Sequence, residues 1–345
     1  MKHFINVILL VLALTALLLF LTDPPAWMPL AASAEAGPVD WLFGLHMDVI
    51  IFLYVLVNGV LLYAVVAFRR KPGDTGDGAY FHSNTRLEIL WTVLPLAVVL
   101  YFSYLGLGVL RQTTAAAADE LEVIVTARQW SWSFEYPDYG IAAGELNLPA
   151  GRKAHLVLRA EDVIHSFWVP EFRLKQDTVP GQEKYLRITP TEVGAYKVRC
   201  AELCGTGHAA MLAPVNVLPP AEFDIWVQKR LGTYVEPEGG AGEGPGEEDI
   251  VALGQQLAQA NGCIACHSLD GSKLVGPSWK GVFGRTEALE DGSSITADEA
   301  YLRTAIIDPG SQIVAGFANL MPANYGDTLL PSEIDAIIAY LKTLE

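Results

Sequence analysis

The chain has 345 residues, of which 51% are hydrophobic, and its mean hydropathy is +0.29. These values are too apolar for an ordinary soluble protein and too polar for one that lies wholly in a membrane, and the length suggests two or three units. The formal net charge of −16 argues against nucleic acid as a partner and is compatible with a basic soluble one. The four cysteines form two close pairs, Cys200 with Cys204 and Cys263 with Cys266, a pattern that indicates chemistry rather than a disulfide framework.

Three stretches near the N-terminus are apolar and uncharged. They are Phe4–Leu21, Val49–Phe68 and Ile89–Leu110. At about 1.5 Å per residue, the last two can cross a hydrocarbon core of about 30 Å, so we expect a transmembrane helical hairpin within residues 45–112. Residues 1–34 allow two readings. The apolar core before Ala32-Ser33-Ala34 is typical of a cleaved signal peptide, but it is also long enough for an additional transmembrane helix.

The basic residues predict the orientation of the hairpin in a bacterial plasma membrane. Four of them lie in the connection between its two helices: Arg69, Arg70, Lys71 and Arg86. We therefore expect this connection in the cytoplasm and everything after Leu110 on the periplasmic or extracellular side. Glu88 begins the last apolar stretch, where a carboxylate is ordinarily a solvated residue stabilised by the helix dipole. Pro95 lies inside that stretch and should kink the helix.

Residues 118–220 change to the period of two that is typical of strands. Turn residues such as Pro180, Gly181 and Gly194 separate the strand-like runs. These runs are Leu121–Ala127, Trp130–Tyr136, His155–Arg159, Tyr185–Ile188, Tyr196–Arg199 and Pro214–Leu218. Short strands with regular turns predict an all-β sandwich or barrel.

The end of this region carries a closely spaced set of metal-binding side chains. Cys200 and Cys204 are followed by His208 and Met211. Thiolate, imidazole and thioether are the ligands that copper prefers, whereas zinc rarely takes methionine. Two thiolates can bridge two metals, which then need one more nitrogen, and His165 is the remaining candidate. A disulfide between the two cysteines would be the better reading if the histidine and methionine were absent.

An acidic, glycine-rich segment at 235–249 separates this region from the last domain, 250–345. It contains no apolar cluster, so we expect an extended linker. Cys263-Ile-Ala-Cys-His267 then matches the C-x-x-C-H pattern of covalent haem attachment, in which His267 binds the iron. The alternatives are a redox pair or half of a zinc site. Ile250–Ala260 is a helix candidate that would present the motif.

The sixth iron ligand should be a distant methionine or histidine. Met321 is the one methionine of residues 250–345, and His267 is the one histidine, so Met321 is chosen by elimination. The alternative is a core methionine beside an open iron site. A final helix is expected to begin around Pro331, with Ser332 as its N-cap and Asp335 at its third position.

Residues 45–220 resemble subunit II of haem–copper cytochrome c oxidases, in which a transmembrane hairpin precedes a cupredoxin-like barrel. The matching motifs are Arg128-Gln-Trp-Ser-Trp-Ser-Phe-Glu-Tyr136, Asp162-Val-Ile-His165, Asp177-Thr-Val-Pro-Gly181 and the cysteine segment. The last domain resembles an all-α class I cytochrome c, with Gly276-Pro277 as the loop whose carbonyl supports the axial histidine. This fusion is the pattern of caa3-type oxidases.

The resemblance implies roles for individual residues. The ligands of a dinuclear CuA centre would be His165, Cys200, the Glu202 carbonyl, Cys204, His208 and Met211. The Glu202 side chain would face a magnesium site shared with subunit I, and Trp130 would be the aromatic residue through which electrons enter. Glu88 occupies the position that family members use at the mouth of a proton path. Arg128 departs from the histidine often found before the Gln-Trp pair, which alters local electrostatics.

The resemblance implies an oxidase subunit that accepts electrons. Haem c would take an electron from a donor complex, a soluble cytochrome or a cupredoxin and pass it to CuA. From there it would go to haem a and the haem–copper site of subunit I, where oxygen is reduced to water and protons are pumped. Subunits I and III and membrane lipid are the expected neighbours. Three rivals are a copper-delivery or assembly protein, a quinol-oxidising subunit II, which would lack the copper ligands, and a stand-alone electron-transfer protein.

Overall fold

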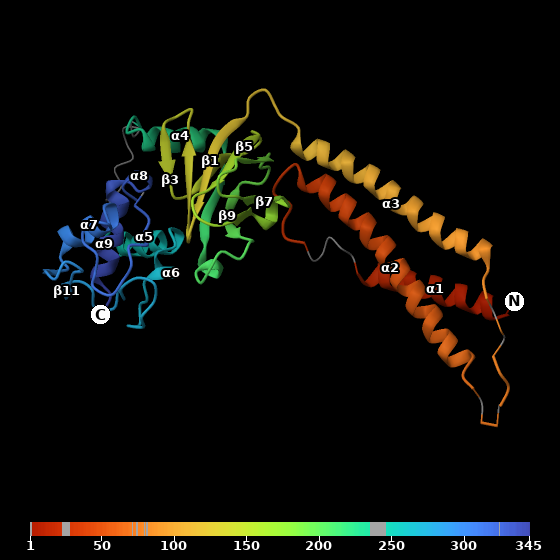
Figure 1. Cartoon of the computed structure of the whole chain (residues 1–345). Coiled ribbons are helices and arrows are strands. Elements are labelled where there is room, and N and C mark those ends of the chain that lie inside the picture. Colours follow the sequence, from red (N-terminus) through yellow and green to blue (C-terminus); the bar gives the residue numbers. More distant parts are fainter. Residues whose placement is uncertain are drawn as a thin grey trace. The chain divides into compact units, whose positions relative to one another are not determined.

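The computed structural model describes residues 2–22, 28–70, 72–73, 75–78, 80, 82–234, 246–323 and 325–345. The chain divides into two units (Figure 1). The first comprises the residues up to Ala31 together with Glu35–Ala115, and the second comprises Ala32–Ala34 together with Ala116–Glu345. Most of the expected linker, residues 235–245, lies outside the described residues.

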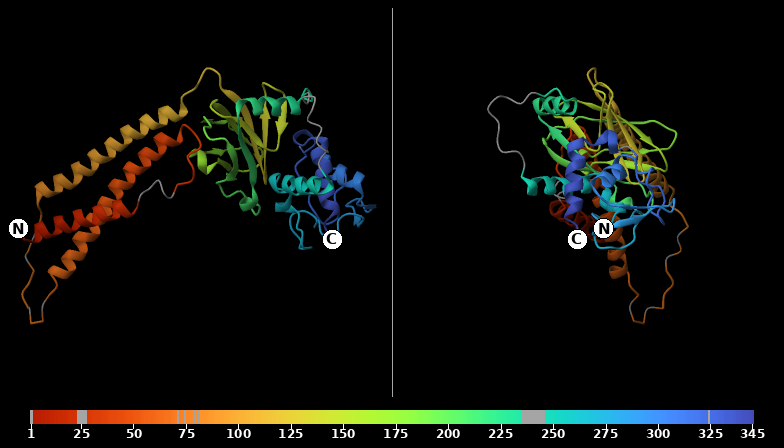
Figure 2. Two further views of the ribbon diagram at one scale, coloured as in Figure 1. Left: turned by 180° about the vertical axis from the view of Figure 1, so that it is seen from behind. Right: turned by 90° about the vertical axis from the view of Figure 1, so that its left-hand side faces the viewer.

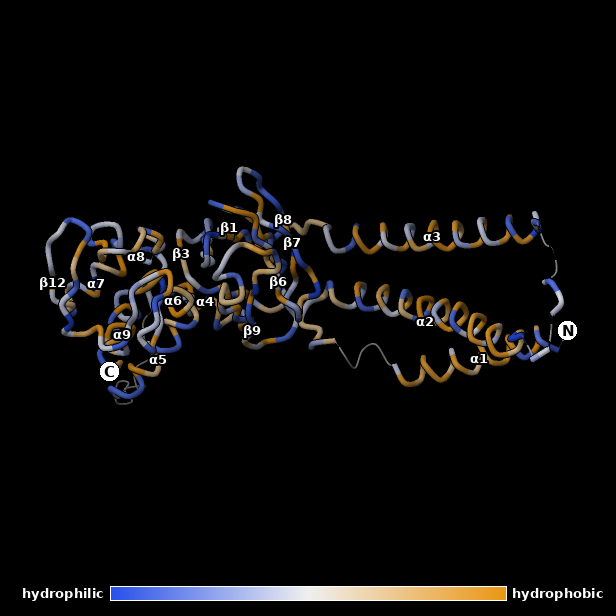
Figure 3. The backbone as a smooth tube through the Cα atoms, turned by 60° about the horizontal axis from the view of Figure 1, so that its bottom comes forward, coloured by the Kyte–Doolittle hydropathy of each residue, from blue (hydrophilic) through white to orange (hydrophobic). Residues whose placement is uncertain are grey.

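The first unit consists of three long apolar helices, which appear as hydrophobic coils in Figure 3. They are α1 (Lys2–Leu21), α2 (Ala36–Ala67) and α3 (Thr85–Thr114), and each is long and apolar enough to cross a membrane. α1 packs along α2, where a side chain added at Gly59 would contact Val11. The three apolar stretches predicted from the sequence are therefore confirmed as helices, and α2 extends well before the predicted Val49.

The N-terminus of α3 explains the immediate surroundings of Glu88. The Asn84 side chain accepts a hydrogen bond from the Leu87 N–H at 3.2 Å and so caps the helix. Oε1 of Glu88 accepts one from the Asn84 N–H at 3.1 Å. In this unit Glu88 is a half-buried residue whose carboxylate helps to close the first turn. Pro95 lies inside the continuous helix Thr85–Thr114.

The second unit contains a barrel-like pair of five-stranded sheets. One sheet has the order β3-β2-β1-β5-β8 and the other β4-β10-β9-β6-β7. The strands are β1 Leu121–Arg128, β2 Ser131–Tyr136, β3 Ile141–Ala143, β4 Leu146–Pro149, β5 Ala154–Ala160, β6 His165–Trp168, β7 Lys175–Thr178, β8 Lys184–Ile188, β9 Gly194–Cys200 and β10 Leu212–Leu218. β1 pairs with β5 and β4 with β10 in parallel, and the other pairs are antiparallel. The predicted all-β class is confirmed.

The core of the barrel follows the alternation read from the sequence. Val123, Val125 and Ala127 of β1 are fully buried, and so are Phe134 and Tyr136 of β2. A helix that the sequence analysis did not predict, α4 (Pro220–Arg230), covers one end of the barrel. α4 packs through Phe223 and Val227, and Trp226 meets Tyr136 edge-on.

The segment Ala32–Ala34 is attached to this barrel. The Ala32 N–H donates to the Glu171 carbonyl and the Ala34 N–H to the Thr189 carbonyl, both at 2.9 Å. Ser33 is buried and donates its hydroxyl to the carbonyl of Phe172 at 3.0 Å. The small residues that resemble a cleavage site are therefore packed into the folded domain.

The last domain is helical, as predicted. Its helices are α5 Glu247–Ala260, α6 Cys263–Cys266, α7 Glu299–Ile307, α8 Tyr325–Thr328 and α9 Pro331–Lys342, with a small hairpin of β11 Thr286–Ala288 and β12 Ser294–Thr296. α5 and α9 cross in close contact at Gly254, where a Cβ would overlap the Ala336 carbonyl oxygen. The two views of Figure 2 show α5 and α9 with the rest of this domain.

Two helix starts differ from the predictions. α5 begins at Glu247 instead of Ile250, because the Asp249 carboxylate accepts a hydrogen bond from the Gly246 N–H and acidic residues stabilise a first turn. α9 has Leu330 as its N-cap, so Ser332 is not the cap. Glu333, rather than Asp335, is the third residue and accepts a hydrogen bond from the Leu330 N–H at 2.6 Å. Proline at the first helical position sets this register.

Candidate copper and haem sites

The candidate copper ligands come from the ends of neighbouring strands. Cys200 is the last residue of β9, and Met211 directly precedes β10. The loop between them is closed by the hydrogen bond from the Cys200 N–H to the Met211 carbonyl, at 3.2 Å. His165 begins β6, which pairs with β9 so that Phe167 lies opposite Cys200. The β-sheet thus brings two distant segments to one point.

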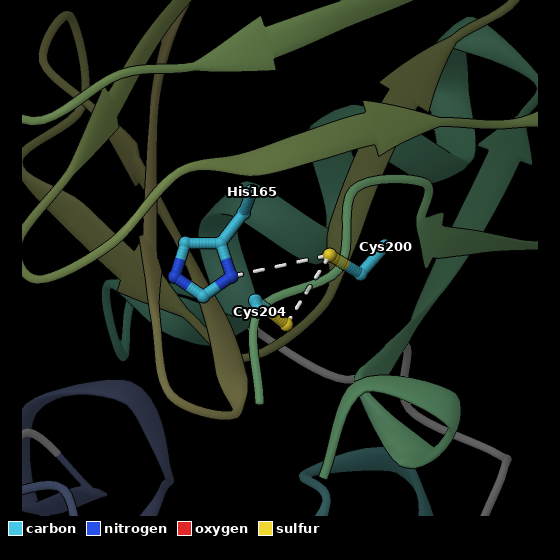
Figure 4. Close-up of side chains that lie close together, drawn as sticks. All are labelled: His165, Cys200 and Cys204. Carbon is cyan, nitrogen blue, oxygen red and sulfur yellow. Dashed lines mark hydrogen bonds between the residues drawn. The ribbon is translucent and has the colours of Figure 1, made fainter. Parts of the chain in front are cut away.

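The side chains from these segments form one cluster, part of which is shown in Figure 4, with His165, Cys200 and Cys204 buried and His208 half-buried. The two Sγ atoms of Cys200 and Cys204 lie 3.6 Å apart. Each thiol has its own imidazole, with Nδ1 of His165 at 3.9 Å from Cys200 and Nδ1 of His208 at 3.6 Å from Cys204. Sδ of Met211 lies 3.8 Å from Sγ of Cys204. All five predicted side chains meet here.

Asp162 orients one of these imidazoles. Its Oδ1 lies 2.8 Å from Nε2 of His165, and the carboxylate also accepts hydrogen bonds from the backbone N–H groups of Gln129 and Val163. Burial alone would raise the pKa of Asp162, but these three hydrogen bonds lower it, so the carboxylate stays ionised. Since an ionised carboxylate only accepts, Nε2 carries the proton and the lone pair of Nδ1 faces Cys200. Asp162 belongs to the motif Asp162-Val-Ile-His165, but its spacing alone does not indicate this role.

The two thiols differ in how readily each loses its proton. Burial raises the pKa of both, but the contact with His165 and nearby backbone groups brings the pKa of Cys200 below its usual value. The pKa of Cys204 is raised by burial and by the proximity of Cys200. This donor set of two sulfurs, two imidazole nitrogens and a thioether fits copper. The Glu202 carbonyl, 3.2 Å from Sγ of Cys200, adds an oxygen, while the Glu202 side chain is exposed.

Trp130 lies directly against the copper-site loop. Its Nε1–H donates to the Cys204 carbonyl at 3.1 Å, and the Gln129 side-chain amide donates to the same oxygen at 2.6 Å. A Cβ on Gly207 would overlap the indole ring, so glycine at this position allows the ring to cover the loop. Trp130 is half-buried, and unlike Trp132, Phe134 and Tyr136 it lies outside β2.

The second site is built around the Cys263–His267 motif. Nδ1 of His267 lies 2.8 Å from the Pro277 carbonyl, which only accepts, so Nδ1 carries the proton and the Nε2 lone pair is available. Burial lowers the pKa of His267 and keeps the ring neutral. The ring stacks on Trp279 at 4.9 Å, and a Cβ on Gly276 would overlap it. Trp279 had no role in the sequence analysis, because nothing in its spacing links it to His267.

A cavity of about 110 Å³ lies beside this histidine. Cys266, His267, Pro277 and Met321 line it together with mostly apolar residues. A mostly apolar lining with a few polar groups is typical of a cofactor pocket. The Cys266 thiol, a neutral imidazole and a thioether line the same cavity, and Cys263 lies one helical turn before Cys266 in α6. These side chains match what a covalently attached haem requires, so the residues fit that group.

The chain joins apolar helices to a cupredoxin-like barrel, which holds a cluster of sulfur and nitrogen donors that could bind metal, and to a helical domain with a haem-attachment motif. Together these parts define a membrane-associated redox protein. Comparison with protein families agrees. Residues 24–108 match the transmembrane domain of cytochrome c oxidase subunit II, residues 143–218 match its periplasmic domain, and residues 251–345 match cytochrome c.

Relatives are similar over nearly the whole chain. Cytochrome c oxidase subunit 2 of Alkalihalophilus pseudofirmus is 32% identical over 97% of this chain and 96% of its own. That of Bacillus subtilis is 30% identical over 98% and 97%. The crystal structure of the periplasmic domain of subunit II of cytochrome oxidase from Bradyrhizobium japonicum is 27% identical, with a TM-score of 0.32, and covers 35% of this chain and all of that one.

The chain belongs to the cytochrome c oxidase subunit II family, in the caa3-type form with a C-terminal cytochrome c domain. It is therefore a membrane protein of an oxidoreductase complex, accepts electrons for a terminal oxidase, binds copper and haem c, and assembles with other oxidase subunits. Membership of this family argues against the two alternatives of a copper-delivery protein and a stand-alone electron-transfer protein.

Proposed function

We propose that this chain holds its two redox groups in series, with haem c receiving electrons first and a dinuclear CuA centre second. The observation that carries the proposal is the cluster in which each of two adjacent buried thiols has its own imidazole. His165, Cys200, Cys204, His208 and Met211 would hold the copper, with the Glu202 carbonyl. Cys263 and Cys266 would hold the haem, with His267 and Met321 as axial ligands and the Pro277 carbonyl supporting His267. When bound, each group would accept and release one electron at a time.

The protein residues keep the geometry of the copper ligands constant during electron transfer. β6 and β9 carry His165 and Cys200, the loop closure fixes Met211, and Asp162 holds the ring of His165. A ligand set that is oriented by its surroundings moves little when its charge changes. The thioethers of Met211 and Met321 would set the potentials of the two centres.

We infer that electrons leave this chain toward haem a and the haem–copper site of subunit I, where oxygen reduction drives proton pumping. Leu203, which is 78% exposed in the copper loop, offers an apolar contact for subunit I. The exposed Glu202 carboxylate beside it is available for a shared magnesium ion. Subunit III, lipid, and a donor complex, cytochrome or cupredoxin are the other partners proposed.

The remaining assignments follow from position in the chain. Trp130, bonded to the Cys204 carbonyl, is proposed as the residue through which electrons reach the copper. Glu88, in the first turn of α3, is proposed at the mouth of a proton path. The basic connection between α2 and α3 supports a cytoplasmic location, with both redox domains on the outer side of a bacterial plasma membrane. Residues 1–34 serve as a signal peptide or a further helix, 45–112 as the hairpin, 118–220 as the CuA domain, 235–249 as the linker and 250–345 as the haem domain.

Optical and EPR spectra of the purified full chain test this proposal. We expect a low-spin haem c spectrum and a mixed-valence signal from two coupled coppers. A haem spectrum without a copper signal after reconstitution with copper would refute the CuA assignment. A signal from a single isolated copper would refute the dinuclear assignment while leaving copper binding in place.

A further inference from the structure

The last residue of α4, Arg230, joins the barrel to the haem domain. Its Nη2 donates to the Ala142 carbonyl of β3 at 2.5 Å and to the Thr328 carbonyl of α8 at 2.6 Å. Its Nη1 lies 3.3 Å from Oε2 of Glu333 in α9. The Arg230 side chain is only 9% exposed. One guanidinium therefore bonds one carbonyl of the barrel and two groups of the haem domain.

The groups that Arg230 meets are themselves held in place. Glu333 accepts the hydrogen bond from the Leu330 N–H that starts α9, so the carboxylate is fixed to a helix end. Ala142 lies in β3, which pairs with β2. Without Arg230, two carbonyls and a carboxylate at this contact would lose a charged donor. Hydrogen bonds from a charged donor are stronger than those between neutral groups, and more than one depends on this residue.

A second contact between the barrel and the haem domain involves no charged group. A Cβ on Gly144 of the barrel would overlap the side-chain oxygen of Asn261, which directly follows α5. Asn261 is buried, and its side-chain amide donates to the Leu257 carbonyl at 2.9 Å, which restrains it. The backbone carbonyl of Asn261 accepts a hydrogen bond from the Tyr325 hydroxyl. Because Gly144 has no side chain, the side chain of Asn261 can occupy this space.

The third contact connects the two sites. Gly262 adopts a positive φ of 71° and directly precedes Cys263. A Cβ on Gly262 would lie 3.2 Å from the Trp130 carbonyl oxygen, so the backbones approach closely there. Trp130 in turn bonds the carbonyl of Cys204. A short series of contacts therefore runs from the haem-attachment motif to the copper ligands.

We propose that Arg230 is a positioning residue that docks the haem domain on the barrel, so that Gly262 and Cys263 face Trp130 and Cys204. This inference rests on the proposed function. The docking serves the transfer of one electron from reduced haem to oxidised copper. In this step no bond is formed or broken and no proton is transferred. Gly144 and Gly262 provide the close approach, and the Arg230 hydrogen bonds hold it.

The test compares Arg230→Gln with Lys229→Gln in the full chain assembled with its oxidase. Lys229 is the exposed neighbour on α4, so its substitution makes the same charge change outside the contact. In Arg230→Gln we expect amide hydrogen exchange around residues 140–145 and 325–333 to rise at least about tenfold. The haem-to-copper transfer rate after a light-triggered electron pulse should fall by a similar factor. Lys229→Gln should match the wild type in both measurements.

A second variant keeps the charges and blocks the contact sterically. Gly144→Ala would place its methyl group against Asn261 and should raise exchange at the same segments, with unchanged haem and copper spectra. Wild-type exchange and transfer rates in both Arg230→Gln and Gly144→Ala would overturn the docking proposal. If the wild type lacked the two-copper signal, the proposed function would fail instead. The exchange measurement would still decide whether Arg230 docks the domain.

Discussion

Nε2 of His165 lies 2.8 Å from Oδ1 of Asp162, and this hydrogen bond directs the other ring nitrogen toward Sγ of Cys200. Because Asp162 also accepts two backbone N–H groups, it is a rigid support for the ring. The carboxylate thus acts on the metal site through a ligand that it holds.

Replacing Asp162 with Asn should weaken copper binding, because the amide can present its NH₂ group to Nε2 and disturb the ring orientation. Loss of such a supporting partner costs about 10- to 100-fold in metal affinity. Copper content after dialysis against a graded chelator measures the effect. Glu161→Gln, which alters the neighbouring carboxylate bonded to Arg128, should retain wild-type copper. Equal affinity in the two variants would contradict the role of Asp162.

Met321→Ala should convert the haem from low spin to high spin or to a misligated form, because Met321 lines the same cavity as His267. The optical spectrum and the EPR spin state report this change. Leu320→Ala, at a neighbouring side chain that is 58% exposed, serves as the control. An unchanged low-spin spectrum in Met321→Ala would show that another group binds the iron.

Gly254→Ala should destabilise the haem domain. The added methyl group would overlap the backbone oxygen of Ala336, and a packed helix crossing cannot shift as easily as a side chain. Overpacking of this kind costs about 1–3 kcal/mol. Thermal or urea unfolding followed by haem absorbance measures the loss. Gln256→Ala, an exposed substitution on the same helix, should leave stability within about 0.5 kcal/mol of wild type.

The mature chain should retain Ala32–Ala34, because these residues pair with the barrel and Ala32 and Ser33 are buried. Intact-mass measurement of the purified subunit decides this. A mature chain that begins at Glu35 would show that the cleavage-site reading is correct and that the barrel folds without this segment. A chain that starts earlier would agree with the packing.

Local spacing in the sequence was sufficient for much of the two sites. Cys200, Cys204, His208 and Met211 belong to one loop, so their approach required only that the loop close. Met321 followed from elimination, and the structure places it in the cavity with His267. The strands β3, β4, β6 and β7 were missed: each has only three or four residues, and burial in β4 and β6 does not alternate between the two faces.

Other features depend on contacts that no spacing encodes. Asp162 supports His165 because β6 begins there, and Trp279 meets His267 only after the chain between them folds back. The Arg230 contact joins residues about a hundred positions apart in sequence. The α9 cap was misassigned because Ser332 is a favourable capping residue, whereas Pro331 determined where the helix begins.

The hydrogen bond between Cys200 and Met211 has a consequence for how the copper domain is assembled. Because strand pairing already closes the loop, folding of the barrel supplies most of the ordering of the ligands. Metal then binds to a nearly prepared site, and its binding free energy adds to the stability of the folded barrel. Unfolding of the barrel should consequently release the copper, and delivery of copper is best suited to a domain that has already folded.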